Sequence, residues 1–400
     1  MRQPSFIAVA LACLIGSSLR GETPDAAIAQ RVAALVEQLG SDDFARREAA
    51  ERQLAELGDA AWEPVSEAAR SSPDLEVRFR ARELLERLRK TRFGEVRRWE
   101  DHRDIVWAVA FSPDDKLLAT GGGGQHQNGT WTAGSDFAIR VWEVAGGGLV
   151  KRLEGHTGAV NCLEWSADGT RLASASSDNS AILWDPATAK PLRRFAGHTA
   201  PVSSVCLTPD GTQLITGSWD ASVIVWNAAS GQLVRKLPNH YGRVWSVALS
   251  PDGKSAAVCG DHPYIRLWNL ADGKISGELQ GHEQAAVRVA FSPDGKWILS
   301  GGWDNTARLW DAAKHTLVRT FEGHTGRVEG LAWTADSRRF VTASLDQQAR
   351  AWDATTGNLL HAYAGHADNL SRVAITRDSR YLATGSWDQT VRLWPMAKLP

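Results

Sequence analysis

The sequence predicts a mainly β protein in which four-stranded units repeat along most of the chain, preceded by a small all-α segment. Three observations lead to this prediction. Tryptophans recur every 42 residues from Trp142 to Trp394, and histidines recur with the same period from His156 to His366. Residues 23–92 instead show helical periodicity and no strand pattern. A fixed period of this length indicates a repeat architecture.

Each repeat contains a short turn motif between two apolar runs. The clearest copy is F-S-P-D-G-K, at Phe291–Lys296. Proline presets the backbone φ angle, aspartate hydrogen-bonds to the local backbone, and glycine adopts the left-handed conformation, so the motif predicts a hairpin between two strands. A second turn, which contains aspartate, precedes the run that holds the recurring tryptophan. Each unit is therefore expected to contribute four strands, the content of one propeller blade.

The repeats resemble those of the WD-repeat β-propeller family. The resemblance rests on G-H, S-P-D-G-K and V-R-L-W-D patterns, which recur in register in seven copies over about 300 residues. It implies a seven-bladed WD-repeat β-propeller over residues 93–400. His102 lies 54 residues before His156 rather than 42, which indicates a 12-residue insertion in the first blade. We place it at Gly121–Thr132, between the second and third strands.

The repeat pattern also predicts how the ring closes. Only six residues follow Trp394, too few for the outer strand of the last blade. The segment V-R-R-W-E-D-H (Val96–His102) aligns with L-R-R-F-A-G-H (Leu192–His198), so it has the pattern of an outer strand without a blade of its own. We expect it to pair with the last blade, because closure removes exposed sheet edges.

Residues 23–92 predict four helices that resemble HEAT-type helix pairs. The first spans about Asp25–Leu39, the second ends at Gly58 and is capped by Ser41 or Asp42, the third lies near Ala60–Arg70, and the fourth follows Pro73. The apolar positions expected to face the core are Ile28, Val32, Leu35, Val36, Leu39, Phe44, Ala50, Leu54, Leu57, Leu75, Phe79, Leu84, Leu85 and Leu88. The alternating Arg and Glu residues of the fourth helix are expected to form a solvated face rather than a nucleic-acid site.

The N-terminus has the form of a secretory signal peptide. Arg2 precedes about fourteen mostly apolar residues, too few for a transmembrane span. Residues 1–20 are therefore assigned to a signal peptide, which predicts a secreted or periplasmic protein and, together with the WD repeats and helical prefix, a bacterial source. A lipoprotein anchored at Cys13 and a buried N-terminal helix are the alternatives.

Composition argues against several classes of function. The net charge is −1, and the pI of about 6.8 gives no reason to expect binding to nucleic acid. Beyond Cys13, the cysteines are Cys162, Cys206 and Cys259, which lie in apolar runs and are expected to be core residues rather than a disulfide framework. No metal site, cofactor or transmembrane span is predicted, and the protein is expected to be a monomer.

Recurring His, Asp and Ser or Thr residues invite comparison with a hydrolase triad. Because the set recurs in every blade, we interpret it instead as a structural network of hydrogen bonds from Trp through Ser or Thr and His to Asp, as the family resemblance implies. The assigned sets are His102/Thr120/Asp136/Trp142, His156/Ser174/Asp178/Trp184, His198/Thr216/Asp220/Trp226, His282/Ser300/Asp304/Trp310, His324/Thr342/Asp346/Trp352 and His366/Thr384/Asp388/Trp394.

Blade 4 departs from this pattern. It keeps His240 and Trp268, but Val258 replaces the hydroxyl residue and His262 replaces the aspartate, with Asp261 one position earlier. We expect this blade to be looser and His262 to reach solvent, because an unpaired buried imidazole is costly.

The resemblance further implies that partners bind at one mouth of the channel, called here the top face. The family's usual contact positions lie three and five residues after the G-H histidine and just before the turn aspartate. At these positions we predict a partner-binding site that comprises Trp107, Trp219, Arg243, Trp245, Asp261, Trp303, Arg327, Glu329 and Trp387. Trp and Arg are enriched in interface hot spots. The alternative is that each Trp only packs over the neighbouring blade, or reflects common ancestry of the repeats.

The predicted function is a non-enzymatic scaffold that binds a protein or peptide at the Trp-rich top face. Two alternatives remain at this stage. Glycan binding is one, because Trp stacks on sugar rings, and a metal-dependent propeller enzyme is the other, for which only Asp261 and His262 offer candidate groups.

Overall fold

The computed structural model describes residues 24–127, 130–237 and 242–397. The chain divides into two compact units, Met1–Arg92 and Phe93–Leu399. The predicted signal peptide, residues 1–20, lies outside the described residues, as does His240 of blade 4.

The first unit contains four helices, α2 (Pro24–Gln38), α3 (Phe44–Leu57), α4 (Asp59–Ser71) and α5 (Leu75–Phe93). Their apolar faces meet in one core, in which Val32, Leu39, Leu54, Val65 and Leu84 are fully buried. Gly58 ends α3 with a φ of 52°, a conformation that glycine adopts without steric cost. The four helices therefore form a small all-α unit, as the periodicity predicted.

Two helices of this unit begin with the same local motif. Asp43 caps α3 by accepting a hydrogen bond from Ala45 N at 2.8 Å, and Asp74 accepts one from Glu76 N at 2.8 Å at the start of α5. The predicted cap at Ser41 or Asp42 is therefore wrong by one or two positions. Ser41 supports the cap instead, because its hydroxyl accepts a hydrogen bond from Asp43 N.

Four apolar residues predicted to face the helical core are exposed instead. Phe44 and Leu75 are the first residues of α3 and α5, with exposed fractions of 63% and 73%, and Ile28 and Phe79 are also exposed. Phe44 and Leu75 are exposed because the first turn of each helix extends beyond the layer that its later turns bury. Helical periodicity alone does not show where that layer ends.

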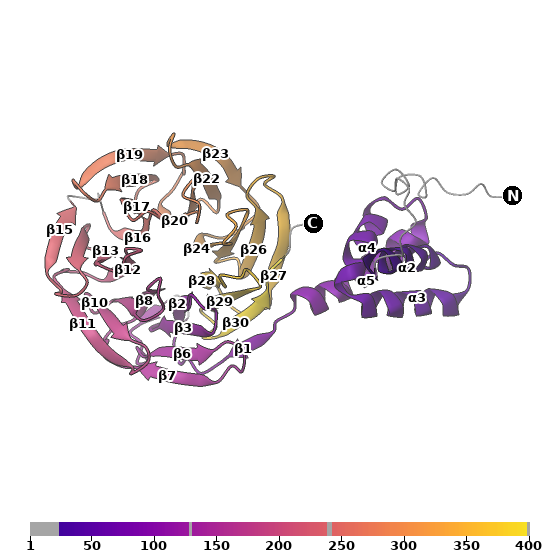
Figure 1. Cartoon of the computed structure of the whole chain (residues 1–400), viewed down its shortest axis with the longest axis horizontal. Helices are drawn as coiled ribbons and strands as arrows, with labels where there is room; N and C mark the ends of the chain where they lie inside the picture. The colour runs from indigo at the N-terminus through magenta and orange to yellow at the C-terminus, as the bar shows by residue number, and fades with distance from the viewer. Residues whose placement is uncertain (1–23, 128–129, 238–241, 398–400) are drawn as a thin grey trace. The chain divides into compact units, whose positions relative to one another are not determined.

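The second unit is a seven-bladed β-propeller, in which four antiparallel strands form each blade (Figure 1). The blades are, in order: β2 (Val106–Phe111), β3 (Leu117–Gly122), β6 (Ile139–Glu143), β7 (Leu149–Leu153); β8 (Val160–Trp165), β9 (Leu172–Ser176), β10 (Ser180–Asp185), β11 (Lys190–Ala196); β12 (Val202–Leu207), β13 (Gln213–Ser218), β14 (Val223–Asn227), β15 (Leu233–Leu237); β16 (Val244–Leu249), β17 (Ser255–Gly260), β18 (Tyr264–Asn269), β19 (Lys274–Gln280); β20 (Ala286–Phe291), β21 (Trp297–Gly302), β22 (Ala307–Asp311), β23 (Thr316–Phe321); β24 (Val328–Trp333), β25 (Arg339–Ser344), β26 (Gln348–Asp353), β27 (Leu359–Ala364); and β28 (Leu370–Ile375), β29 (Tyr381–Ser386), β30 (Val391–Pro395) with β1 (Arg97–Trp99).

Strand β1 closes the ring as the sequence predicted. It pairs antiparallel with β30, with Arg97 opposite Leu393 and Trp99 opposite Val391. Trp99 is 3% exposed and packs into the core between blades 7 and 1, while its Nε1 donates to Gly147 O at 2.9 Å. The last blade is thus completed by residues from the start of the propeller.

The S-P-D-G-K motif forms the expected hairpin between the first two strands of a blade. In blade 5, Ser292 Oγ donates to Asp294 Oδ1 at 2.6 Å and accepts from Trp297 N at 2.9 Å, while Gly295 has a φ of 72°. These turns define the bottom face of the propeller. The loops before each first strand and the turns between the second and third strands define the top face.

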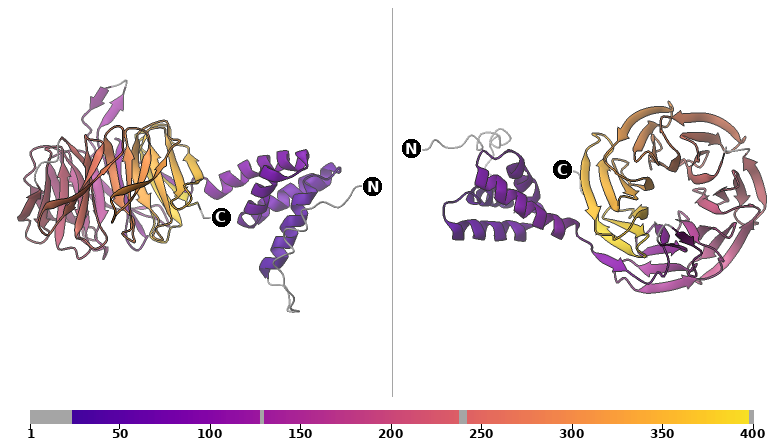
Figure 2. Two further views of the ribbon diagram at one scale, coloured as in Figure 1. Left: turned by 90° about the horizontal axis from the view of Figure 1, so that it is seen from above. Right: turned by 180° about the vertical axis from the view of Figure 1, so that it is seen from behind.

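The 12-residue insertion forms a hairpin of β4 (Gln125–Gln127) and β5 (Thr130–Thr132) between the second and third strands of blade 1. Figure 2 shows this hairpin standing out from one face of the propeller. The buried Asp104 carboxylate fixes its base, because it accepts hydrogen bonds from Ser135 N and Asp136 N at 2.8 Å and from Gln125 Nε2 at 3.1 Å. The side chain of Trp131 lies outside the described part of the hairpin.

Candidate functional site

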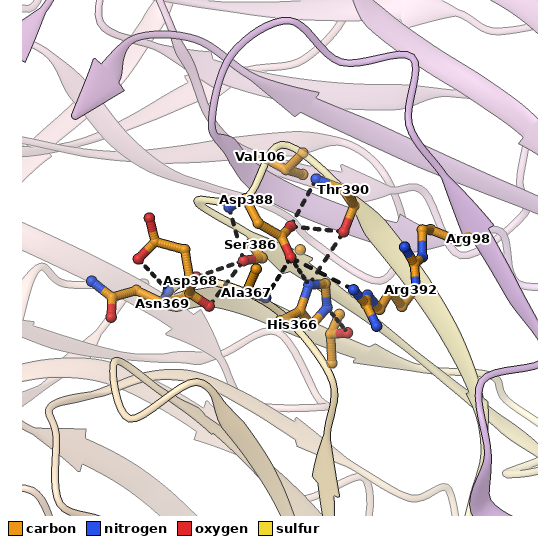
Figure 3. Close-up of polar contacts among 12 residues, drawn as sticks. Arg98, Val106, His366, Ala367, Asp368, Asn369, Ser386, Asp388, Thr390 and Arg392 are labelled. Atoms are coloured by element: carbon orange, nitrogen blue, oxygen red, sulfur yellow. Dashed lines mark hydrogen bonds and ion pairs between the residues drawn. The ribbon is translucent and has the colours of Figure 1, made fainter. Parts of the chain in front are cut away.

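Five blades contain the complete predicted hydrogen-bond network. In blade 2, Trp184 Nε1 donates to Ser174 Oγ at 2.8 Å, Ser174 Oγ lies 2.7 Å from His156 Nε2, and His156 Nδ1 lies 2.7 Å from Asp178 Oδ2. The same contacts recur in blades 3, 5, 6 and 7 around His198, His282, His324 and His366. Figure 3 shows His366 beside Asp388 in blade 7.

The network has one consistent direction. An ionised carboxylate can only accept, so His156 Nδ1 must donate to Asp178, and Nε2 of the neutral ring then accepts from the Ser174 hydroxyl. That hydroxyl in turn accepts from Trp184. The hydroxyl residues of all five networks are 0% exposed, so no substrate reaches them. These sets therefore hold the blades together and are not catalytic triads.

Electrostatics support the same interpretation. Burial alone would raise the pKa of Asp220, but hydrogen bonds from Ser222, Thr199 N and His198 outweigh it and hold the pKa at about 2. Burial is also the main reason that the pKa of His198 falls below its usual value, against the opposing pull of Asp220. The pair is thus a carboxylate beside a neutral imidazole.

Blade 1 departs from the predicted network. His102 Nε2 lies 2.8 Å from Thr120 Oγ1, and Trp142 donates to the same oxygen. The predicted contact between His102 and Asp136 is replaced, because Arg140 lies between them and donates to Asp136 Oδ2 at 2.6 Å while its Nη1 lies 3.3 Å from His102 Nδ1. Burial, reinforced by Arg140, lowers the pKa of His102 to about 3.

In the described part of blade 4, the recurring tryptophan has no acceptor. Trp268 Nε1 is buried and has no hydrogen-bond partner among the described residues, because Val258 stands where the other blades have a hydroxyl. His262 is half-buried and stacks on Tyr264, with ring centroids 5.1 Å apart, so it keeps partial access to solvent, as expected. Because His240 lies outside the described residues, the rest of this network is not placed.

Three of the predicted top-face tryptophans form a continuous group across blades 3 to 5. The ring centroids of Trp219 and Trp245 are 5.0 Å apart, and those of Trp245 and Trp303 are 5.9 Å apart. All three side chains are half-buried. We call these residues, with Arg243 and Arg327, the aromatic–arginine cluster.

Arg243 covers two of the three rings. Its guanidinium carbon lies 5.6 Å from the ring centroid of Trp219 and 5.0 Å from that of Trp245. Asp261 fixes this arrangement, because it accepts hydrogen bonds from Arg243 Nε at 3.0 Å and from Trp245 Nε1 at 2.9 Å. Partial burial opposes ionisation of Asp261, but these hydrogen bonds outweigh it and lower its pKa. The displaced aspartate of blade 4 thus organises the top face rather than the blade interior.

Arg327 covers the third ring. Its guanidinium carbon lies 4.1 Å from the ring centroid of Trp303, within the range of a cation–π interaction. Trp303 Nε1 donates to Glu329 Oε1 at 3.2 Å. Arg327 is exposed, and no carboxylate lies within ion-pair distance of it in the described parts of the chain.

Trp107 and Trp387 form a second, separate pair. Their ring centroids are 5.7 Å apart in an edge-to-face arrangement, and Trp107 Nε1 donates to Gly123 O at the base of the insertion. The pair joins blade 1 to blade 7. The structure therefore divides the nine predicted site residues into a group of seven around blades 3 to 6 and this pair.

The turn tryptophans follow a common rule. Each contacts the residue five positions after the G-H histidine in the next blade: Trp219 contacts Trp245, Trp303 contacts Glu329, and Trp387 contacts Trp107. Each Trp thus packs over its neighbour, as one alternative expected, and remains half-buried at the top face. Packing between blades and partner binding are therefore compatible roles.

The family model described as "WD domain, G-beta repeat" matches residues 93–143, 147–185, 189–227, 231–269, 273–311, 315–353 and 357–395. Each match begins with the outer strand of one blade and continues through the first three strands of the next, so the seven matches together account for the seven blades. The chain belongs to the WD-repeat family. Propellers of this family generally serve as protein-interaction scaffolds and are generally not enzymes.

No curated protein matches this WD-repeat protein. In the described residues, no helix is both long enough and apolar enough to cross a membrane, and no group of three or more His, Cys, Asp or Glu side chains is arranged to hold a metal ion.

Sequence reasoning missed a cavity in the axial channel of this WD-repeat protein. Arg288, Arg372 and Glu164 line it, together with Cys162 and Cys206. Cys206 and Cys259 are buried in the core as predicted, whereas Cys162 is half-buried; Cys162 and Cys206 also border the cavity. The sequence does contain a signal for this cavity at the position six residues after the G-H histidine. Most repeats have a small residue there, whereas blades 5 and 7 have Arg.

Proposed function

We propose that this WD-repeat protein is a non-catalytic scaffold that binds a protein or peptide through the aromatic–arginine cluster. The observation that carries the proposal is that two exposed arginines lie over three contiguous half-buried tryptophans. Such a surface offers apolar area from the rings and directional donors from the guanidiniums. Trp and Arg are the residue types that dominate binding energy in protein interfaces.

Two features give the cluster the rigidity that favours binding. Asp261 holds both Arg243 and Trp245, and Glu329 holds Trp303, so these side chains lose little conformational freedom when a partner binds. The unpaired charge of Arg327 adds attraction for an acidic group of the partner.

Glycan binding is less well supported by this geometry. A sugar ring stacks on an open aromatic face, whereas guanidinium groups already lie over Trp219, Trp245 and Trp303. A peptide can instead bind around the arginines and at the exposed ring edges.

Selection of peptides from a phage-displayed random dodecapeptide library provides the test. Peptides enriched on the whole protein should bind a W219A/W245A/W303A variant at least about tenfold more weakly, because hot-spot residues each contribute about 2 kcal/mol or more. W297A is the matched control, because Trp297 is also half-buried but begins β21 on the bottom face. Equal binding by the folded triple variant, or the absence of any enriched peptide, would reject the proposal. A triple variant that has lost its fold would assign the tryptophans to packing.

We also propose that the mature protein acts outside the cytoplasm. The support is the apolar stretch after Arg2, which has the form of a signal peptide. N-terminal sequencing of the protein from its native source decides this: a terminus between Ser17 and Gly21 is expected, and an intact Met1 would contradict it.

A further inference from the structure

The axial channel of the propeller contains a cavity of about 410 Å³. The first strands of the blades surround it, as the ring of inner strands in Figure 1 shows. Its lining extends to the exposed Pro209 and Pro251, in turns of the bottom face, so the cavity opens there. None of the aromatic–arginine cluster lines it. The cavity is therefore distinct from the proposed partner site.

Two guanidinium groups lie at the end of the cavity nearest the top face. Arg288 and Arg372 occupy equivalent positions in blades 5 and 7, six residues after their G-H histidines. The corresponding residues in the other blades are Ala108, Cys162, Ser204, Ser246 and Gly330, all of them small. Space in the channel at this level is thus left for whatever binds beside the two arginines.

Backbone carbonyls satisfy only part of the hydrogen-bonding capacity of these arginines. Arg288 Nε donates to Glu329 O at 2.7 Å, and its Nη1 donates to Trp245 O at 3.0 Å and to Val287 O at 3.1 Å. Arg372 Nη2 donates to Asn161 O at 2.8 Å. Among the described residues, Nη2 of Arg288 and both Nε and Nη1 of Arg372 have no acceptor, and these atoms are not sealed from solvent.

The charges of the two arginines are not neutralised by an ion pair among the described residues, and Glu329 only attracts Arg372 from beyond ion-pair distance. Neither arginine has an ion pair within 4.0 Å in the described parts of the chain. Burial, followed by repulsion from Arg288, lowers the pKa of Arg372 to about 10. Two cations held together in this way lower the free energy of any anion that binds between them.

The remaining wall is suited to a small organic body. Ala248, Ala290 and Phe291 line one side of the cavity, and Glu164 is its single acidic residue. Glu164 accepts a hydrogen bond from Leu207 N at 2.9 Å, and burial raises its pKa to about 7. The cavity thus keeps a net positive charge whether or not Glu164 is ionised.

We propose that the axial cavity binds a small organic oxyanion, whose carboxylate or phosphate oxygens accept hydrogen bonds from Arg288 and Arg372. The planar guanidinium presents two parallel N–H groups that match the spacing of such oxygens. The ligand reaches the site through the bottom face, while the top face remains available to a partner.

Thermal unfolding and isothermal titration of the whole protein test this proposal with two probes, succinate and inorganic phosphate, against sodium chloride at equal ionic strength. Saturable binding is expected for at least one probe, and the probe that binds distinguishes a carboxylate ligand from a phosphate ligand. The R288M/R372M variant should bind it at least about tenfold more weakly, because it loses the charge-assisted hydrogen bonds of both guanidiniums.

R319M is the matched control, because Arg319 also donates to a backbone carbonyl, that of Thr355, but lies on the outer strand β23. It should bind the probe like the wild type. No saturable binding of either probe by the wild type, or undiminished binding by folded R288M/R372M, would overturn the proposal.

Crystals of the wild-type protein soaked in selenate give a readout that does not depend on a variant. An anomalous selenium peak within hydrogen-bonding reach of both guanidiniums is expected. If R288M/R372M fails to fold, this measurement decides: a channel without a selenium peak contradicts the site.

Discussion

Equivalent histidines in different blades experience different electrostatics. His198 faces Asp220 directly, whereas Arg140 lies between His102 and Asp136. Because the guanidinium donates to His102 Nδ1, this imidazole uses its Nε2–H to donate to Thr120, the reverse of the direction in the other blades. A residue's position in the repeat therefore does not fix its protonation tautomer. The local partner does.

The raised pKa of Glu164 predicts how the stability of the folded protein depends on pH. Its pKa is about 7 in the folded protein and 4.5 for the unperturbed side chain, so between these values the unfolded chain releases a proton that the folded protein keeps. Stability relative to Glu164→Gln is therefore greatest below pH 4.5 and is lost as pH rises to about 7. Urea unfolding at pH 5 and 8 should show the variant gaining up to about 3 kcal/mol over the wild type, less if solvent in the open cavity screens the charge.

Glu283→Gln provides the comparison for the loss of a carboxylate at an exposed loop. The wild type and Glu164→Gln should approach each other in stability toward pH 5 and separate toward pH 8. A stability difference between these two proteins that stays constant with pH would show that Glu164 is ionised in the folded protein throughout this range.

At the scale of the element, periodicity predicted nearly everything that is repeated and little that is not. The 42-residue spacing located the strands, the five complete networks and the closing strand, because each depends on contacts that recur from blade to blade. The role of Arg140 was not predicted, because the sequence does not distinguish it from Arg308 and Arg350 at the same repeat position. Those two arginines lie beside their His–Asp pairs, whereas Arg140 lies between His102 and Asp136. The exposure of Phe44 and Phe79 was not predicted, because helical periodicity shows which side of a helix is apolar but not how far the core extends along it.

The nine top-face residues illustrate the same limit at the candidate site. The family positions located Trp219, Trp245 and Trp303 on one face, but not the contacts among them. The sequence showed that the aspartate of blade 4 is displaced by one residue, to Asp261. It did not show that Asp261 would accept hydrogen bonds from Arg243 and Trp245. Contacts between blades depend on side-chain direction, which a spacing of residues does not specify.

Blade 4 offers a test of what one hydroxyl contributes to a blade. Val258 pairs with Arg266 in the register that pairs Thr216 with Ile224 in blade 3, so a threonine at 258 places its hydroxyl near Trp268 Nε1. Val258→Thr should raise the free energy of unfolding by about 1 kcal/mol, because a buried donor gains its acceptor without a change in side-chain shape. Urea unfolding followed by tryptophan fluorescence measures this.

The reciprocal change in blade 3, Thr216→Val, leaves Trp226 Nε1 without its acceptor and removes the partner of His198 Nε2. It should destabilise the protein by about 1–3 kcal/mol. If Val258→Thr destabilises the protein as well, the core of blade 4 is packed around Val258, and the absence of a hydroxyl there costs the blade no stability.

At the scale of the whole molecule, the propeller depends on a contact between residues far apart in sequence. Strand β1 joins β30, and Arg392 Nη1 donates to Glu95 Oε2 at 2.7 Å. Blade 1 also packs against blade 7 through the core that contains Trp99, Val109 and Leu393. Because each blade rests on its two neighbours, we expect this last contact to add to the stability of the ring.

Two truncations separate the role of β1 from that of the helices. A chain of residues 93–400 retains β1 and should unfold in one cooperative transition, because the propeller is a compact unit from Phe93 onward. A chain of residues 101–400 lacks Trp99, which is 3% exposed, and leaves the edge of β30 unpaired. It should be less stable by about 3–5 kcal/mol, the usual cost of deleting a buried aromatic side chain, and should aggregate through the open edge.

Urea unfolding measures the loss of stability, and light scattering measures aggregation. Trp99→Ala in the full chain is the control that separates lost packing from lost strand pairing, since it keeps the backbone of β1. If the shorter chain remained as stable and monomeric as the longer one, the seventh blade would be complete with three strands, and ring closure would rest on packing between blades 7 and 1 alone.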